Sequence, residues 1–498
     1  MSATLRRRCR TALAALLVVT GAGAGAGFAG AGPASSGPPQ VGLLAAAPHV
    51  EIQRVEGAGV HLDLGVFLAA RGGALRIDVV REGWSSTLHA VQKDRDGGVV
   101  RTLPAGLVRS FAGLHRFLRV AFSRDGAVAA RRVLTVCPNG WERQRLDDSG
   151  PTEPTFPESC THEHFPFTRS SVWGVDQGWA VGLVGDVRQR PFDVPAGEYD
   201  VTVEILPDWA DALGVKPGDR AVRLTATVVE VALPEPRPPD DPAAMSAATA
   251  PGRGPAGAPS ASPAAGARQP LLPDLAALPA WRIEVQREDG RDHLSFAATP
   301  WNAGPGPFVL EGFRRGDGRV MDAFQYLYDG QGRVVGRAPA GEMAYHAGGG
   351  HDHWHLLQFA AFDLLTLEGR PAAPGLKQGF CLATTDAVDL AAPGAQLRPY
   401  ANGPTSSCGG ARALWVREVL PAGWGDTYFN VSGQAFDVTD LPNGRYLLRV
   451  RVDPLRQLTQ VRTDNDEASR EVDLGGRPGA RTVTVAPWNG IRDQRAAA

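Results

Sequence analysis

The chain has 498 residues, with 51 lysines and arginines against 53 aspartates and glutamates, so its formal net charge is −2. This near-neutral balance argues against nucleic acid as a partner. A chain of this length folds as more than one domain, each long enough to bury a core. Sixty glycines and forty prolines predict many turns and some unfolded linker.

The first 31 residues have the pattern of an export signal. Arginines between positions 6 and 10 precede an apolar run from Thr11 to Thr20, and Ala29-Gly30-Ala31 fits a signal-peptidase site. The alternative is an uncleaved membrane anchor, but an apolar core of about ten residues is shorter than the ~20 that a spanning helix needs. We therefore predict a secreted protein with a signal peptide at 1–31, followed by a disordered stretch at 32–47.

Export places the later cysteines in an oxidising compartment. Cys137, Cys160, Cys381 and Cys408 allow three pairings. The local one, Cys137–Cys160 with Cys381–Cys408, is the simplest because a linker separates the two couples. The chain has no Cys-x-x-Cys motif, so we expect no thiolate zinc site.

Residues 48–232 read as an all-β unit. Apolar and polar residues alternate in Leu75–Val80, Phe117–Phe122 and Tyr199–Ile205, and turn residues follow at short intervals. An immunoglobulin-like β-sandwich is the fold that this pattern favours. We predict an accessory domain that contacts cell wall or matrix.

Two features of this first domain leave alternatives open. His162 and His164 form a His-x-His pair, which is either a second metal site or a polar loop beside a disulfide. Trp173, Trp179 and Trp209 either line a carbohydrate-binding face or belong to the core.

A second unit follows a linker. Residues 233–270 are rich in Pro, Ala, Gly and Ser and lack the large apolar residues of a core. Residues 271–475 are again strand-like, which predicts a second β-sandwich, and 476–498 is predicted to be a C-terminal tail. The turn Pro442-Asn443-Gly444 lies between two strand-like segments and predicts a hairpin.

The most informative motif is a cluster of four histidines. His351, His353 and His355 are spaced at i, i+2 and i+4, and His346 lies just before them. In an extended strand this spacing puts the three imidazoles on one face. The alternative is an exposed polar face. Imidazole binds both copper and zinc, so the spacing predicts a metal site without choosing the metal.

Lysine usage is the second clue. The chain has only Lys93, Lys216 and Lys377 among its 51 cationic residues. A lysine can lose its proton when buried and act as a nucleophile, whereas arginine cannot. Lys377 is therefore either a functional residue or residual background.

Several motifs occur in an order that resembles the lysyl oxidase catalytic domain, over about residues 271–475. They are His351-Asp-His353-Trp-His355, Ala361-Phe-Asp-Leu-Leu, Lys377-Gln-Gly-Phe-Cys381, Trp424-Gly-Asp-Thr-Tyr428, Phe436–Val450 and Asp464-Asn465. The sequence departs from animal members at Gly350, where they have cysteine, and at Trp354, where they have tyrosine.

The resemblance implies a copper site and an organic cofactor. His351, His353 and His355 match the family's copper ligands. Lys377 and Tyr428 match the residues that join to form lysine tyrosylquinone, after copper and O₂ oxidise the tyrosine ring. The quinone condenses with a primary amine, a base removes a proton, and hydrolysis releases an aldehyde.

The implied activity is that of a secreted copper amine oxidase that acts on primary amines, including peptidyl lysine, and releases hydrogen peroxide and ammonia. The base should be a carboxylate or histidine near the site, and its candidates are Asp352, Asp363, Asp426 and His346. One alternative is a catalytically silent copper-binding or adhesion β-sandwich protein. Another is a zinc-dependent hydrolase, which would leave Lys377 and Tyr428 without a role.

Overall fold

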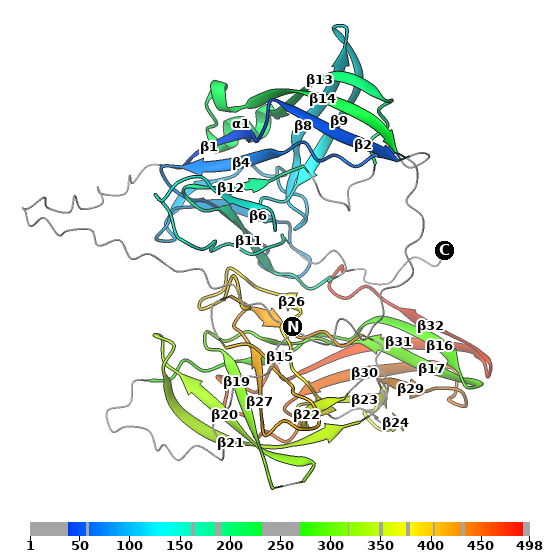
Figure 1. Cartoon of the computed structure of the whole chain (residues 1–498). Coiled ribbons are helices and arrows are strands. Elements are labelled where there is room, and N and C mark those ends of the chain that lie inside the picture. Colours follow the sequence, from blue (N-terminus) through cyan, green and yellow to red (C-terminus); the bar gives the residue numbers. More distant parts are fainter. Residues whose placement is uncertain are drawn as a thin grey trace, which may run out of the picture. The chain divides into compact units, whose positions relative to one another are not determined.

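The computed structural model describes residues 38–55, 59–160, 165–184, 191–231, 269–316, 318–347, 352–374, 379–401, 404–429 and 434–491. These residues are mostly β-strand, and Pro207–Leu213 (α1) is the one α-helix among them (Figure 1). The predicted all-β class is confirmed. None of the described helices is long and apolar enough to cross a membrane.

Strands between residues 40 and 231 form three sheets. The first has the order β1 (Gln40–Ala45), β4 (Val66–Arg71), β12 (Trp179–Gly182) and β10 (Arg143–Arg145). The second has the order β11 (Ser170–Val175), β5 (Leu75–Val80), β6 (His89–Lys93) and β7 (Val99–Thr102). The third has the order β3 (Gly59–Val60), β2 (His49–Val55), β14 (Ala221–Val231), β13 (Gly197–Ile205), β8 (Leu114–Arg124) and β9 (Ala127–Val136).

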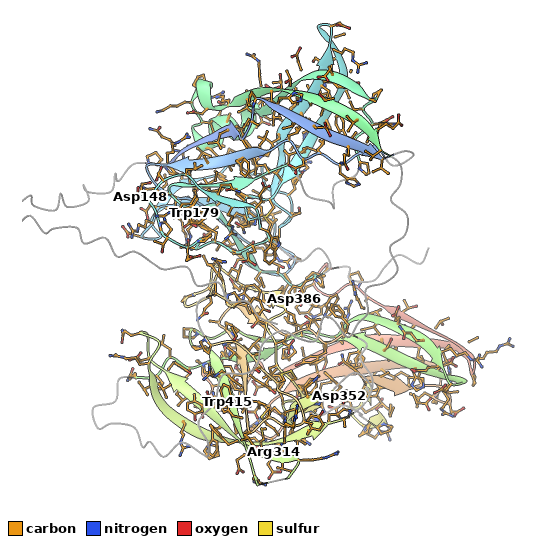
Figure 2. The ribbon with its side chains drawn as sticks, in the orientation of Figure 1. Asp148, Trp179, Arg314, Asp352, Asp386 and Trp415 are labelled. Atoms are coloured by element: carbon orange, nitrogen blue, oxygen red, sulfur yellow. A yellow bond between two sulfur atoms is a disulfide. The ribbon has the colours of Figure 1, made fainter. Side chains whose placement is uncertain are left out.

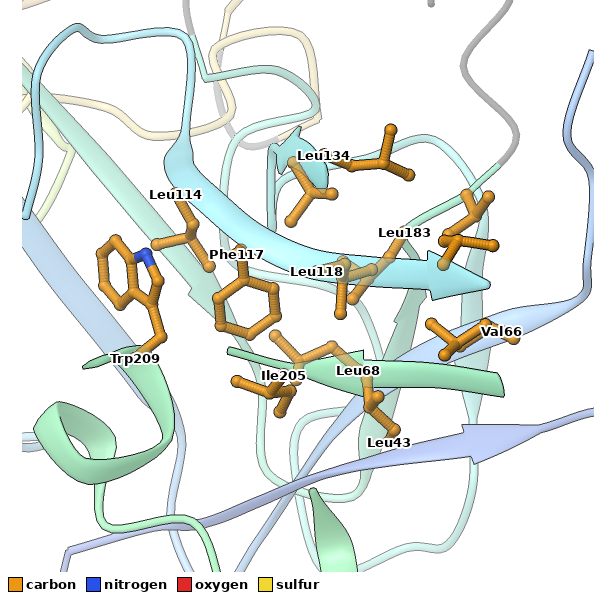
Figure 3. Close-up of a cluster of buried hydrophobic side chains, with 14 of the residues drawn as sticks. Leu43, Val66, Leu68, Leu114, Phe117, Leu118, Leu134, Leu183, Ile205 and Trp209 are labelled. Atoms are coloured by element: carbon orange, nitrogen blue, oxygen red, sulfur yellow. The ribbon is translucent and has the colours of Figure 1, made fainter. Parts of the chain in front are cut away.

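Alternating side chains of these strands build one large apolar core. Figure 3 shows part of it, including Phe117 of β8 and Trp209 of α1, whose rings lie 5.8 Å apart between centroids. The Trp209 indole donates to the carbonyl of His115 at 2.8 Å, which satisfies its one polar atom. Trp173 is fully buried in the same core.

Strands from residue 275 onward form four more sheets. Two are small: β15 (Leu275–Ala277), β18 (Pro300–Asn302), β28 (Trp424–Gly425) and β26 (Asp386–Ala387), and then β16 (Trp281–Glu288), β17 (Arg291–Ala297) and β29 (Ala435–Asp437). The largest has the order β25 (Gly379–Phe380), β22 (His353–Leu357), β21 (Val334–His346), β20 (Val320–Tyr328), β19 (Phe308–Arg314) and β27 (Trp415–Leu420). The last has the order β24 (Pro371–Ala373), β23 (Ala360–Thr366), β30 (Gly444–Val452), β31 (Glu467–Arg477) and β32 (Ala480–Val485).

These sheets share a second apolar core, which is rich in phenylalanine. Phe296 packs edge-on against Phe362 of β23 and is stacked with Phe436 of β29. Phe380 of β25 packs edge-on against both Phe359 and Phe362. The core therefore fixes the short edge strand β25, which lies beside the histidine-bearing strand β22.

The predicted hairpin at Pro442-Asn443-Gly444 is wrong. Strand β29 pairs with β17, whereas β30 pairs with β23 and β31, so the turn carries the chain from one sheet to another. The hydroxyl of Tyr446 donates to the carbonyl of Pro442 at 2.8 Å, four residues upstream. This tyrosine corner is a feature of β-sandwiches, and Tyr199 makes the equivalent bond to Pro195 at 2.9 Å.

Two segments predicted to lack structure contain strands. Residues 40–45, inside the stretch predicted to be disordered, form β1 and pair with β4. Residues 480–485, inside the predicted tail, form β32 and pair with β31. Both are edge strands. The partner of β1 is distant in sequence, whereas the partner of β32 lies directly before it, across a glycine turn. The signal peptide lies outside the described residues, as does the linker except for residues 269 and 270, and the predicted domain boundaries stay predictions.

Both predicted disulfides are formed, Cys137–Cys160 and Cys381–Cys408. The four described cysteines therefore have no free thiolate. The expectation that the chain lacks a thiolate zinc site stays a prediction.

Candidate functional site

Strand β22 brings histidines together with the end of β21. His353 lies directly opposite His346 in the antiparallel register, and His355 lies opposite Ala344. Alternation puts His353 and His355 on the same face, and their ring centroids are 4.7 Å apart. The His346 ring is stacked on that of His355 at 5.4 Å. His351, the third predicted ligand, lies outside the described residues.

Trp354 anchors the histidine strand from the opposite face. Its side chain is fully buried, and its indole donates to the carbonyl of Gly410 at 3.1 Å. Its backbone N–H donates to the carbonyl of Cys408 at 3.0 Å. The aromatic residue inside the histidine run is therefore a core residue, which fixes the strand that presents the imidazoles.

Strand β25 extends the same sheet beyond β22. Phe380 pairs with Leu356, and Gly379 pairs with Leu357. A Cβ atom on Gly379 would lie 3.2 Å from the Cβ of His355 and 3.4 Å from its Nδ1, so glycine permits this close approach. Lys377 lies outside the described residues.

Tyr428 joins this group from a third part of the chain. Its ring lies 4.7 Å from the ring of Phe380, in an edge-on arrangement. Its hydroxyl lies 2.9 Å from the carbonyl of Cys381 and also donates to the carboxylate of Asp426. Burial, reinforced by the negative charge of Asp426, raises the pKa of Tyr428 well above its ordinary value.

Two buried carboxyl groups lie beside the segment 381–383. Asp426 is 2% exposed and accepts the N–H of Ala383 at 3.0 Å. Glu418 is fully buried and accepts the N–H of Leu382 at 3.1 Å. Burial raises the pKa of Glu418 well above its ordinary value. Sequence reasoning missed Glu418, although its alternation with the apolar Val416 and Leu420 would have placed it on the core face.

The four candidate bases have different surroundings. Asp363 is paired with two arginines, Arg449 and Arg451, each at 3.0 Å, and this ion-pair network explains it as a structural residue. Asp352 is exposed at the start of β22 (Figure 2). Asp426 contacts the Tyr428 hydroxyl, and His346 contacts His355. Asp426 and His346 therefore each contact a predicted site residue.

The candidates in the first half of the chain are two histidines and three tryptophans. His162 and His164 lie outside the described residues. Trp173 and Trp209 are buried, so they are core residues rather than a sugar-binding face. Trp179 is half-buried and donates its indole N–H to the carbonyl of Pro151 at 2.9 Å.

The donor types present fit a copper ion. Imidazole is a ligand that copper favours, and His346, His353 and His355 bring three of them within a few ångströms. The hydroxyl of the buried Tyr428 donates to a carboxylate, so an acceptor for its proton is already in place.

Comparison with known proteins identifies the same part of the chain. The model of the lysyl oxidase family matches residues 324–483. Lysyl oxidase homolog 4 of Mus musculus is 31% identical over 137 residues, which are 27% of this chain and 16% of that protein. The Homo sapiens protein of the same name is 31% identical over 118 residues, which are 23% of this chain and 14% of that protein.

The match therefore spans about a sixth of the length of the curated relatives. It begins later than residue 271, where the sequence resemblance was placed, and it covers the positions of all five predicted site residues. The chain carries a lysyl oxidase family domain in residues 324–483 and is a distant homologue of lysyl oxidase homolog 4.

Proposed function

We propose that this protein is a secreted copper-dependent amine oxidase of the lysyl oxidase type, which converts primary amines to aldehydes through a quinone built from Lys377 and Tyr428. One observation carries the proposal. Strands β22 and β25 and the residues around Tyr428 are distant in sequence, yet they meet. A Cβ atom on Gly379 would lie 3.2 Å from that of His355, and the rings of Phe380 and Tyr428 are 4.7 Å apart between centroids. The fold thus brings together the segments that carry or adjoin the predicted site residues, which burial of apolar side chains alone would not require.

The proposed copper ligands are His351, His353 and His355. The shared face of His353 and His355, with their ring centroids 4.7 Å apart, supports this assignment. The rigid anchoring of Trp354 keeps that face toward the site. Bound copper would supply, with O₂, the oxidation of the Tyr428 ring, and the quinone would offer a carbonyl to the substrate amine.

The protein's own groups handle the protons. The carboxylate of Asp426 accepts the Tyr428 hydroxyl and is the nearest base for its proton. Lys377 must present a neutral amine to add to the oxidised ring, which an arginine could not do. For the later removal of the substrate's α-proton, we propose Asp426 or His346, which both touch predicted site residues.

The proposed substrates are primary amines, including lysine side chains of proteins, and the proposed products are an aldehyde, hydrogen peroxide and ammonia. The site lies in a lysyl oxidase family domain and contains imidazole donors suited to copper and a buried tyrosine. These features support an amine oxidase but do not select one amine as its substrate. Export is supported by the two disulfides, since such bonds persist in oxidising compartments.

The test is to express the full chain with copper under O₂ and to measure copper content, visible absorption and labelling by phenylhydrazine. We expect a coloured adduct in the wild type and in the control Lys216→Arg, which changes an exposed lysine outside the family match. The adduct should be lost in Lys377→Arg and in Tyr428→Phe, while copper content is retained. Copper-loaded wild type without an adduct would refute the oxidase and favour a silent copper-binding protein.

A further inference from the structure

Glu418 is a buried acid that the proposed reaction does not use. It lies in β27, on the same core-facing side of the strand as Val416 and Leu420, and its side chain is fully buried. Among the described residues, its Oε1 atom has no hydrogen-bond partner. Burying an acid in this way is costly unless it keeps its proton.

The surroundings of Glu418 connect it to the site. One of its carboxyl oxygens and the sulfurs of Cys381 and Cys408 all lie within 4.8 Å of one another. Its Oε2 atom accepts the N–H of Leu382, and the next N–H, of Ala383, donates to Asp426. A segment of three residues, 381–383, is thus held by two carboxyl groups and by its contact with Tyr428.

The two carboxyl groups are not equivalent. Asp426 accepts two hydrogen bonds, from the Ala383 N–H and the Tyr428 hydroxyl, and both favour its ionised form. Within the described part of the chain, Glu418 accepts one hydrogen bond, from the Leu382 N–H, and burial together with the negative charge of Asp426 raises its pKa. Two buried anions in one region would repel each other, so the charge is better placed on Asp426, which accepts two hydrogen bonds where Glu418 accepts one.

We propose that Glu418 is a positioning residue for Tyr428. As a neutral carboxylic acid, it holds the segment 381–383 in place through the Leu382 N–H and leaves Asp426 as the single buried anion beside the tyrosine. The proton step is then balanced within one pair. The Oη–H bond of Tyr428 breaks, a bond between that proton and Oδ2 of Asp426 forms, and no electrons are exchanged.

The charge state is tested in metal-free protein, so this test does not depend on oxidase activity. We expect the infrared carbonyl band of a protonated carboxylic acid at neutral pH in the wild type and in Asp426→Asn. The band should be absent in Glu418→Gln. A band that persists in Glu418→Gln, or that disappears only in Asp426→Asn, would overturn the proposal.

A second measurement follows the tyrosinate absorbance of Tyr428, taken as the difference between each protein and its Tyr428→Phe counterpart. Asp426→Asn should move this titration to lower pH by more than Glu418→Gln does, because the charge of Asp426 raises the pKa of Tyr428 more than that of Glu418. An equal or larger move in Glu418→Gln would mean that Glu418, and not Asp426, carries the main charge beside Tyr428, and the proposal would fail.

The positioning role rests on the proposed function and is tested by the rate of quinone formation. Glu418→Met leaves the Leu382 N–H buried without an acceptor and should slow quinone formation about tenfold. Glu418→Gln restores the acceptor and should recover most of that rate. Equal rates in the Met and Gln variants would refute the role. Absence of quinone in the wild type would refute the oxidase, while the infrared result would still decide the protonation of Glu418.

Discussion

The Cys381–Cys408 disulfide connects the two halves of the candidate site. The carbonyl of Cys408 accepts the N–H of Trp354, between the two described histidines of β22. The carbonyl of Cys381 contacts the hydroxyl of Tyr428 at 2.9 Å. We therefore predict that removing this disulfide impairs the site beyond its effect on stability.

The magnitude follows from loop lengths. The Cys381–Cys408 bond joins residues 27 apart in sequence, which corresponds to roughly 3.6 kcal/mol of stabilisation by the chain-entropy relation. The Cys137–Cys160 bond joins residues 23 apart and corresponds to roughly 3.4 kcal/mol. The Cys137–Cys160 bond is thus a suitable control, because it contributes a similar stabilisation and lies outside the family match.

The assay compares two double Cys→Ser variants, one for each disulfide. Urea unfolding followed by circular dichroism should show a similar decrease in the free energy of unfolding for each variant. The value for each is taken from the unfolding transition that the variant shifts. Copper affinity should fall about tenfold only when Cys381 and Cys408 are replaced, because only that variant releases the anchor of β22. Equal effects of the two variants on copper binding would refute the reasoning.

Two further predictions concern single side chains. Asp426→Asn removes the negative charge beside the Tyr428 hydroxyl, so the pKa of Tyr428 should fall, and a difference titration of tyrosinate absorbance checks this. An unchanged titration would contradict the contact. Gly379→Ala places a Cβ 3.2 Å from that of His355 and should displace the ring, which should weaken copper binding about tenfold in a metal titration. Gly410→Ala, with nothing within 4 Å of its added Cβ, is the control and should bind copper normally.

Part of the site follows from local sequence. Alternation along a strand is a backbone property, so the spacing of His353 and His355 sufficed to put them on one face and Trp354 on the other. The disulfide pairing also followed from simple separation along the chain. The order of the motifs was enough to predict the family, which the comparison confirms.

Other features depend on which strands become neighbours. The turn before Gly444 has the residues of a hairpin, but β29 pairs with β17 and β30 pairs with β23, in two different sheets. The approach of Gly379 to His355 is likewise set by sheet order and not by any local pattern. Long-range pairing is decided by burial of whole sheet faces, which short segments do not encode.

The sequence by itself determined the all-β class, the histidine face and the chemical types of the proposed site residues. Only the tertiary structure decided that Glu418 and Asp426 flank one backbone segment beside Tyr428. The reason is physical: the cost of a buried charge depends on every neighbour within the low-dielectric interior, and those neighbours come from strands far apart in the chain.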